Sequence, residues 1–165
     1  KLIADCGAIP SIGVDCDCHV RALFMFQYLH LKPMADLPPL PFSGPFSVAI
    51  VVDASMTDGW RNRVCDWLAL AGCRSMSAWG VDASAWDDAM DWANIAMFEP
   101  HAIPDEHFIL TTWATDESLP EFLEEFQCVG RLAERPVEQQ LLLHIGMDER
   151  REALMQAWSQ SSGEI

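Results

Sequence analysis

Acidic side chains and one histidine stand at the ends of the apolar segments of this chain that have the composition of β-strands. Four residues have this position: Asp53, Asp82, Asp116 and His144. If these side chains converge, their oxygens could bind a divalent metal, or one carboxyl could stay protonated beside an ionised base. The pattern therefore allows a metal-dependent hydrolase with these four as catalytic residues. Aspartate is also a common helix cap after a strand, which is the more frequent role.

A second group lies at helical spacing in residues 84–94. Asp87, Asp88 and Asp91 share one flank of the expected helix, and like charges one turn apart repel each other. The helix N-terminus offsets this for the first two aspartates but hardly for Asp91. We expect Trp86 in the core and Trp92 on a partner-binding surface, where tryptophan is enriched.

These aspartates belong to a longer acidic stretch. Between Arg74 and Arg131 the chain has twelve carboxylates and no lysine or arginine. The full set of partner-binding candidates is Asp87, Asp88, Asp91, Trp92, Asp116, Glu117, Glu121, Glu124 and Glu125. The formal net charge of −15 disfavours nucleic acid and anionic membranes and favours a basic protein partner. Acidity could also serve solubility alone.

The elements that position these residues follow from alternating patterns. Apolar, strand-like runs alternate four times with amphipathic helical patterns, which predicts a three-layer α/β fold with helices on both faces of a mostly parallel, four-stranded sheet. The expected strands are 46–52, 74–79, 107–113 and 139–145. The expected helices begin at Ser55 or Thr57, at Ser84, at Ser118 and at residue 147. The apolar stretch 20–31 is either a short helix or an additional N-terminal edge strand, because periodicity does not decide.

The sequence suggests an irregular leader (1–27), one α/β domain (28–160) and a polar tail (161–165). A proline-rich connector, 32–45, lies inside the domain. No secretory signal is visible, so we expect a cytoplasmic protein with reduced cysteines. The metal-like tract of Cys6, Cys16, Cys18 and His19 lacks the spacing of a zinc site. We expect no metal and no cofactor, and no phosphate-binding glycine motif occurs.

From residue 28 to about 158 the chain resembles an uncharacterised bacterial domain family. The segments that carry the resemblance are Tyr28-Leu29-His30-Leu31, the Trp79-Gly80 to Asn94 stretch (WGVDASAWDDAMDWAN), Thr111-Thr112-Trp113 and Leu141–Ile145 (LLLHI). The resemblance implies a small stand-alone bacterial domain. It implies no activity and no catalytic residues.

Three functional hypotheses remain at this stage. The first is a small acidic protein-binding module, of the kind in which an immunity protein neutralises a basic toxin. The second is the metal-dependent hydrolase at the carboxyl edge of the sheet. The third is a structural role in which surplus apolar surface is buried in a homodimer. We favour the first, and regard an enzyme as the less favoured alternative.

Overall fold

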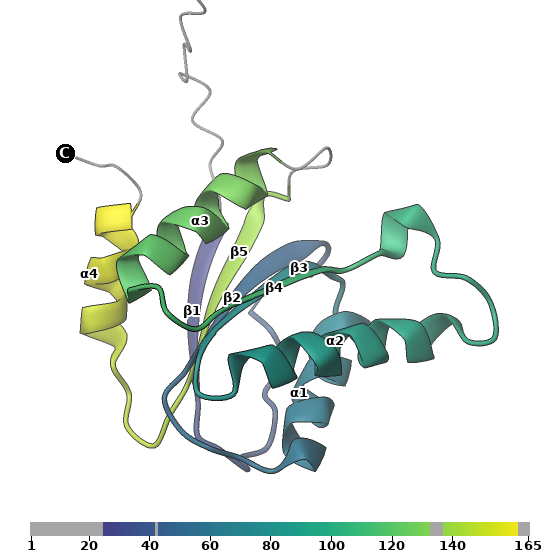
Figure 1. Ribbon diagram of the computed structural model, residues 1–165, viewed down its shortest axis with the longest axis horizontal. Coiled ribbons are helices and arrows are strands. Elements are labelled where there is room, and N and C mark those ends of the chain that lie inside the picture. Colours follow the sequence, from purple (N-terminus) through teal and green to yellow (C-terminus); the bar gives the residue numbers. More distant parts are fainter. Residues whose placement is uncertain (1–24, 42, 133–136, 162–165) are drawn as a thin grey trace, which may run out of the picture.

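The computed structural model describes residues 25–41, 43–132 and 137–161 (Figure 1). Its strands form one sheet in the order β1-β5-β2-β3-β4, and every pair of neighbours is parallel. The strands are β1 (Met25–Leu31), β2 (Phe46–Val52), β3 (Cys73–Gly80), β4 (Leu110–Ala114) and β5 (Gln139–Ile145). The α/β prediction is confirmed. The sheet has five strands rather than four, because the N-terminal apolar stretch supplies the edge strand that the sequence left open.

Four α-helices cover the two faces of the sheet. They are α1 (Asp58–Leu70), α2 (Ala83–Phe98), α3 (Leu119–Leu132) and α4 (Arg151–Ser161), with a short 3-10 helix η1 (Asp105–His107) before β4. The first two helices pack on one face and the last two on the other (Figure 1). The central strand β2 is buried along its whole length, as its continuous apolar composition predicts. Its alternate side chains therefore enter two separate cores.

Two helix starts show how local chemistry sets the element bounds. The Thr57 side chain accepts a hydrogen bond from the Trp60 amide and caps α1. At α3, the Ser118 amide donates to the Glu121 carboxylate, as the capping signature predicts, and the Ser118 hydroxyl donates to the same oxygen. These bonds lower the pKa of Glu121.

The predicted start of α2 is wrong. The helix begins at Ala83, and the preceding Asp82 is left-handed (φ 54°) with no side-chain capping bond. Gly80 explains this turn: it has φ +102°, and a Cβ there would lie 2.3 Å from the Val52 carbonyl oxygen. The tight approach of β3 to β2, rather than a hydroxyl cap at Ser84, decides where the helix begins.

Other bounds also differ from the sequence prediction. The third predicted strand started at residue 107, but β4 starts at Leu110. The reason is Asn94, whose side chain donates to the His107 carbonyl oxygen and accepts from the Ile109 amide, so these groups do not join the sheet. The last helix begins at Arg151 rather than residue 147. Residues 25–27, assigned to the leader, open β1. The cysteine tract of the leader lies outside the described residues.

Candidate functional site

The first candidate site lies at the carboxyl ends of β2 and β5. These strands are neighbours, yet the helix after β2 (α1) covers one face of the sheet and the helix after β5 (α4) covers the other. In an open parallel sheet, ligands bind at the carboxyl ends of two neighbouring strands whose following helices lie on opposite faces. Asp53 follows β2, and its amide donates to the Ile145 carbonyl oxygen over 2.8 Å. The backbone thus brings Asp53 beside the end of β5.

His144 is the centre of this site. Its side chain is fully buried, and its Nε2 lies 2.9 Å from Oδ2 of Asp53. Its Nδ1 lies 3.2 Å from the hydroxyl oxygen of Tyr28. Since a carboxylate only accepts hydrogen bonds, the neutral ring carries its proton on Nε2, and Nδ1 accepts from Tyr28. Both ring nitrogens are therefore satisfied, as a buried imidazole requires.

Charged and aromatic neighbours enclose the pair. Arg150 donates to the same Oδ2 of Asp53 over 2.6 Å and is 47% exposed. His30 stacks on His144, with ring centroids 4.9 Å apart, and its Nε2 lies 2.9 Å from the Gly146 carbonyl oxygen. Gly146 itself has no room for a side chain, because a Cβ would lie 2.9 Å from His144 Nε2. The chain after β5 therefore closes tightly over the imidazole.

This enclosure shifts the pKa values of His144 and Tyr28. Burial lowers the pKa of His144 and outweighs the hydrogen bond that His144 donates to Asp53, which raises this pKa. Burial, with help from the negative charge of Glu149, raises the pKa of Tyr28 to about 12. The side chains of His144 and Tyr28 are accordingly neutral near pH 7.

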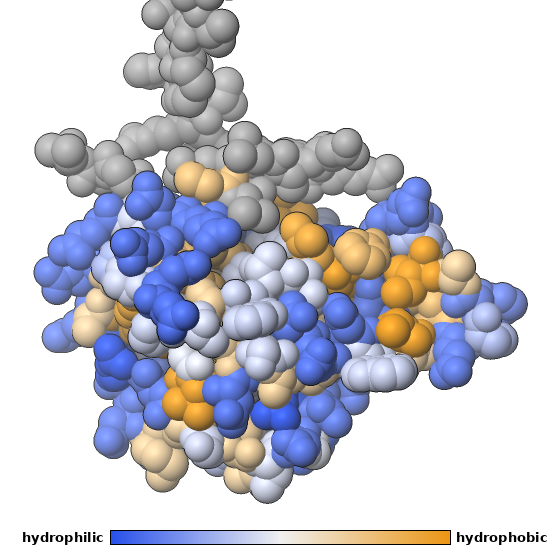
Figure 2. Space-filling view, viewed as in Figure 1, coloured by the Kyte–Doolittle hydropathy of each residue, from blue (hydrophilic) through white to orange (hydrophobic). Residues whose placement is uncertain are grey.

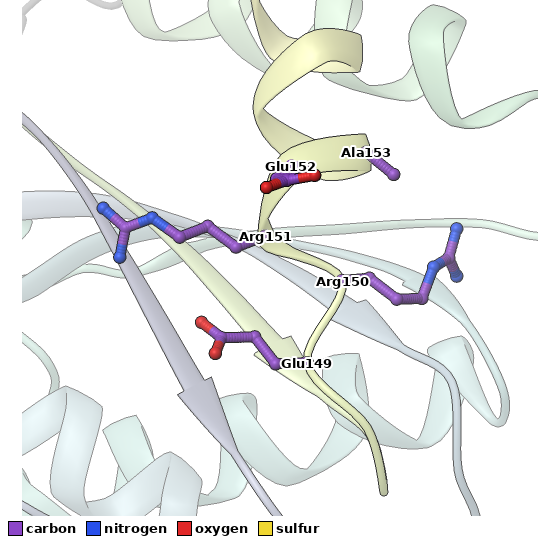
Figure 3. A pocket seen from close by; sticks show the side chains of 5 residues that line it. All are labelled: Glu149, Arg150, Arg151, Glu152 and Ala153. Carbon is purple, nitrogen blue, oxygen red and sulfur yellow. The ribbon is translucent and has the colours of Figure 1, made fainter.

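An open hollow lies next to this network at the start of α4. It is lined by Glu149, Arg150, Arg151, Glu152 and Ala153 (Figure 3). In Figure 3 the side chains of Arg150 and Arg151 extend to opposite sides of the loop. The Arg151 guanidinium lies 5.2 Å from the centroid of the Tyr28 ring, so it covers the outer side of the hydrogen-bonded network.

The structure joins only part of the predicted catalytic set. Asp53 and His144 are in contact, whereas Asp82 and Asp116 have no hydrogen bond or ion pair with them. Within the described ranges, no three or more histidine, cysteine, aspartate or glutamate side chains form a group that could hold a metal ion. Sequence reasoning missed Tyr28, His30 and Arg150 as members of this site. The sequence did contain one indication of this site, because His30 and His144 each lie inside an apolar strand. The structure pairs these two histidines directly between β1 and β5.

The second candidate site is the surface formed by α2 and β4. Thr111 of β4 donates to Oδ1 of Asp91 over 3.1 Å, which fixes the acidic flank of α2 beside the edge strand. Asp91 has a raised pKa, first because of partial burial and then because of the charges of Asp87 and Asp88. Like charge is thus concentrated beside β4.

Apolar side chains are exposed on the same two elements. Trp92 is 70% exposed, whereas Trp86 is fully buried, as predicted for each. Trp113 of β4 is 49% exposed. The other exposed apolar side chains of this region are Ile95, Met97, Phe108 and Leu110. Figure 2 shows apolar side chains gathered where the end of α2 approaches the segment around η1. Large exposed apolar patches mark interaction sites.

The remaining acidic candidates are placed elsewhere. Glu121, Glu124 and Glu125 are exposed on α3, which covers the opposite face of the sheet from α2. The two acidic helix flanks are therefore separated by the sheet. Asp116 and Glu117 are exposed after β4, and the Trp79 indole N–H holds this turn by donating to the Glu117 carbonyl oxygen over 2.9 Å.

The fold and these two sites define a parallel α/β domain with a buried histidine network at the carboxyl ends of β2 and β5 and an acidic, aromatic surface beside the edge strand β4. Residues 26–161 match the model of a domain of unknown function (DUF7684), and the chain belongs to that family. No curated protein and no solved structure matches the chain. Among the described residues, no helix is both long and apolar enough to cross a membrane.

Proposed function

We propose that this chain is an acidic protein-binding module that docks a basic protein through the α2–β4 surface. One observation carries the proposal: Trp92, 70% exposed, directly follows Asp91, which is bonded to the edge strand. Exposed tryptophan supplies most of the energy in many interfaces, and carboxylates around it would steer a basic partner and raise the association rate.

The local charge supports a basic partner over a neutral one. The stretch between Arg74 and Arg131 contains no lysine or arginine that could neutralise its carboxylates. Concentrated like charge beside β4 raises the free energy of the unbound chain, and a cationic partner would relieve this repulsion. The biological role that we infer is of the immunity type, in which the module neutralises a basic partner or toxin in the bacterial cytoplasm.

The described cysteine thiols are compatible with the proposed location in the reducing cytoplasm. Cys65 and Cys73 are both free and buried. Burial raises the pKa of both thiols, to about 12 for Cys73, and a protonated, enclosed thiol is chemically inert. The chain therefore needs no disulfide between these two residues to complete its core.

Charge reversal with a matched control tests the proposal. The tagged chain is used to purify a partner from its native host, and binding of that purified partner is then measured by calorimetry at several salt concentrations. The variant Asp87→Lys/Asp88→Lys should weaken binding at least about tenfold, and higher salt should weaken wild-type binding. The control Glu124→Lys/Glu125→Lys changes the net charge equally on the opposite face and should retain affinity. Equal loss in both variants, or a partner without excess positive charge, would refute the proposal.

The metal-dependent hydrolase stays a second proposal because Asp53 and His144 are hydrogen-bonded at the carboxyl ends of β2 and β5, where the following helices cover opposite faces of the sheet. Arg150 already binds the carboxylate oxygen that a metal would need, so a divalent ion would have to displace it. Mg²⁺, Mn²⁺ or Zn²⁺ should raise the melting temperature if this alternative holds. Unchanged melting with all three counts against it. Sedimentation of the isolated chain separately tests the homodimer.

A further inference from the structure

The outer edge of β4 is unprotected in the described part of the chain. Among the described strands, β4 is the last in the sheet order and pairs only with β3. No backbone hydrogen bond from a loop or turn among the described residues reaches Leu110–Ala114. Within the described residues, the backbone N–H and C=O groups on this edge have no backbone hydrogen-bond partner, which is the condition for pairing with another chain.

The composition of β4 does not discourage strand addition. Natural edge strands are commonly blunted by lysine, proline or a β-bulge. β4 has the sequence LTTWA, without charge or proline, and its pairing with β3 has no register shift. Threonine and tryptophan both favour strand structure. Four consecutive side chains, from Leu110 to Trp113, are also partly or well exposed.

Alternation along β4 gives an added strand two different faces. Thr111 lies on the α2 face, where it bonds to Asp91, and Trp113 shares this face because side chains alternate. Thr112 lies on the other face, where its hydroxyl is 2.8 Å from that of Ser77, and Leu110 shares that face. A strand beside β4 would therefore place alternate side chains near Asp91 and Trp113 on the α2 face and near Leu110 and Thr112 on the other face.

Both ends of β4 add negative charge. Asp105 and Glu106 are exposed in η1 before the strand, and Asp116 and Glu117 are exposed after it. Together with Asp91 of α2, which lies beside β4, they give negative charge next to the strand and in the segments before and after it. Charge complementarity thus selects a lysine- or arginine-containing segment over an acidic or neutral one.

We propose that β4 binds an extended basic segment of the partner protein as an additional edge strand. This inference rests on the proposed function and names the part of the partner that is bound. Main-chain hydrogen bonds to β4 would supply affinity, and the carboxylates on the α2 face would supply specificity for basic side chains. The occupant has a basic side chain at every second position, facing α2, and no proline within the paired stretch.

A displayed library of random decapeptides is the probe, with the full chain as target. Enriched peptides should contain alternating lysine or arginine and lack proline. The best binder is then synthesised in two backbone N-methylated forms, one methylated at odd and one at even positions. N-methylation removes strand hydrogen bonds but keeps side chains and charge. One form should bind at least about tenfold more weakly than the parent peptide, while the other, whose methyl groups face solvent, should retain affinity.

Amide hydrogen exchange gives an independent measurement. Binding of the unmethylated peptide should slow exchange of amides within β4 (Leu110–Ala114) and leave β1, the other edge strand, unchanged. Failure to enrich any peptide, equal affinity of both methylated forms and the parent, or unchanged exchange in β4 overturns strand addition. Basic peptides could instead fail both backbone tests and still bind the Asp87→Lys/Asp88→Lys variant more weakly than the wild-type chain. That result would refute strand addition and leave the proposed function intact. Binders without basic residues would contradict both.

Discussion

Replacing Asp53 by alanine removes the acceptor on which a buried histidine depends. The His144 side chain is fully buried and donates to Oδ2 of Asp53 over 2.9 Å. A hydrogen bond to a charged acceptor contributes about 1.5–3 kcal/mol. Arg150 adds at most about 1 kcal/mol, because it is half exposed and screened by water. Asp53 itself is 24% exposed, so water can partly replace its carboxylate. We expect Asp53→Ala to lower the free energy of unfolding by about 2 kcal/mol.

Urea unfolding at pH 7.5, followed by tryptophan fluorescence, measures this change, and an unaltered m-value shows that the comparison is valid. Two controls separate the contributions. Asp53→Asn retains an acceptor for His144 and loses only the charge, so it should cost about 1 kcal/mol. Arg150→Gln should cost less than about 1 kcal/mol. If Asp53→Ala is no more destabilising than Arg150→Gln, the buried hydrogen bond is not what the carboxylate provides, and our account of this network fails.

The remaining predictions concern protonation, a backbone contact and thiol reactivity. Because the folded-state pKa of His144 is lowered, the unfolded chain takes up the proton first as pH falls below about 6.5. Stability should therefore be complete above that pH and decline toward pH 5 in urea titrations; an equally steep decline in His144→Gln would contradict this. Gly80→Ala should cost more than about 2 kcal/mol, because its Cβ would meet the Val52 carbonyl oxygen at 2.3 Å at a left-handed φ; calorimetric melting within a degree or two of wild type would refute it. Cys65 and Cys73 should resist iodoacetamide in the native chain and react after denaturation, as peptide mass spectrometry can show; native labelling at the denatured rate would contradict their burial.

Local sequence patterns were sufficient for most elements. Residues 46–52 and 139–145 were predicted as strands with the bounds that β2 and β5 have, because continuous apolar runs are characteristic of strands buried on both faces. The capping signature of Ser118 and Glu121 also predicted its helix correctly. The predicted element bounds were wrong where a side chain distant in sequence binds backbone groups that would otherwise pair in the sheet. Asn94 delays β4 by binding residues on either side of Phe108, and no pattern within the strand records that contact.

The sequence by itself determined the α/β class, the acidic character, the burial of Trp86 and the exposure of Trp92, because these depend on composition and on periodicity along single elements. Only the tertiary structure decided which distant residues meet. Parallel pairing brought Tyr28, Asp53 and His144 together from three strands, and it placed Asp91 against Thr111. It also put the acidic flanks of α2 and α3 on opposite faces of the sheet. Strand order and crossover side set these relations, and neither is encoded in the spacing of any one segment.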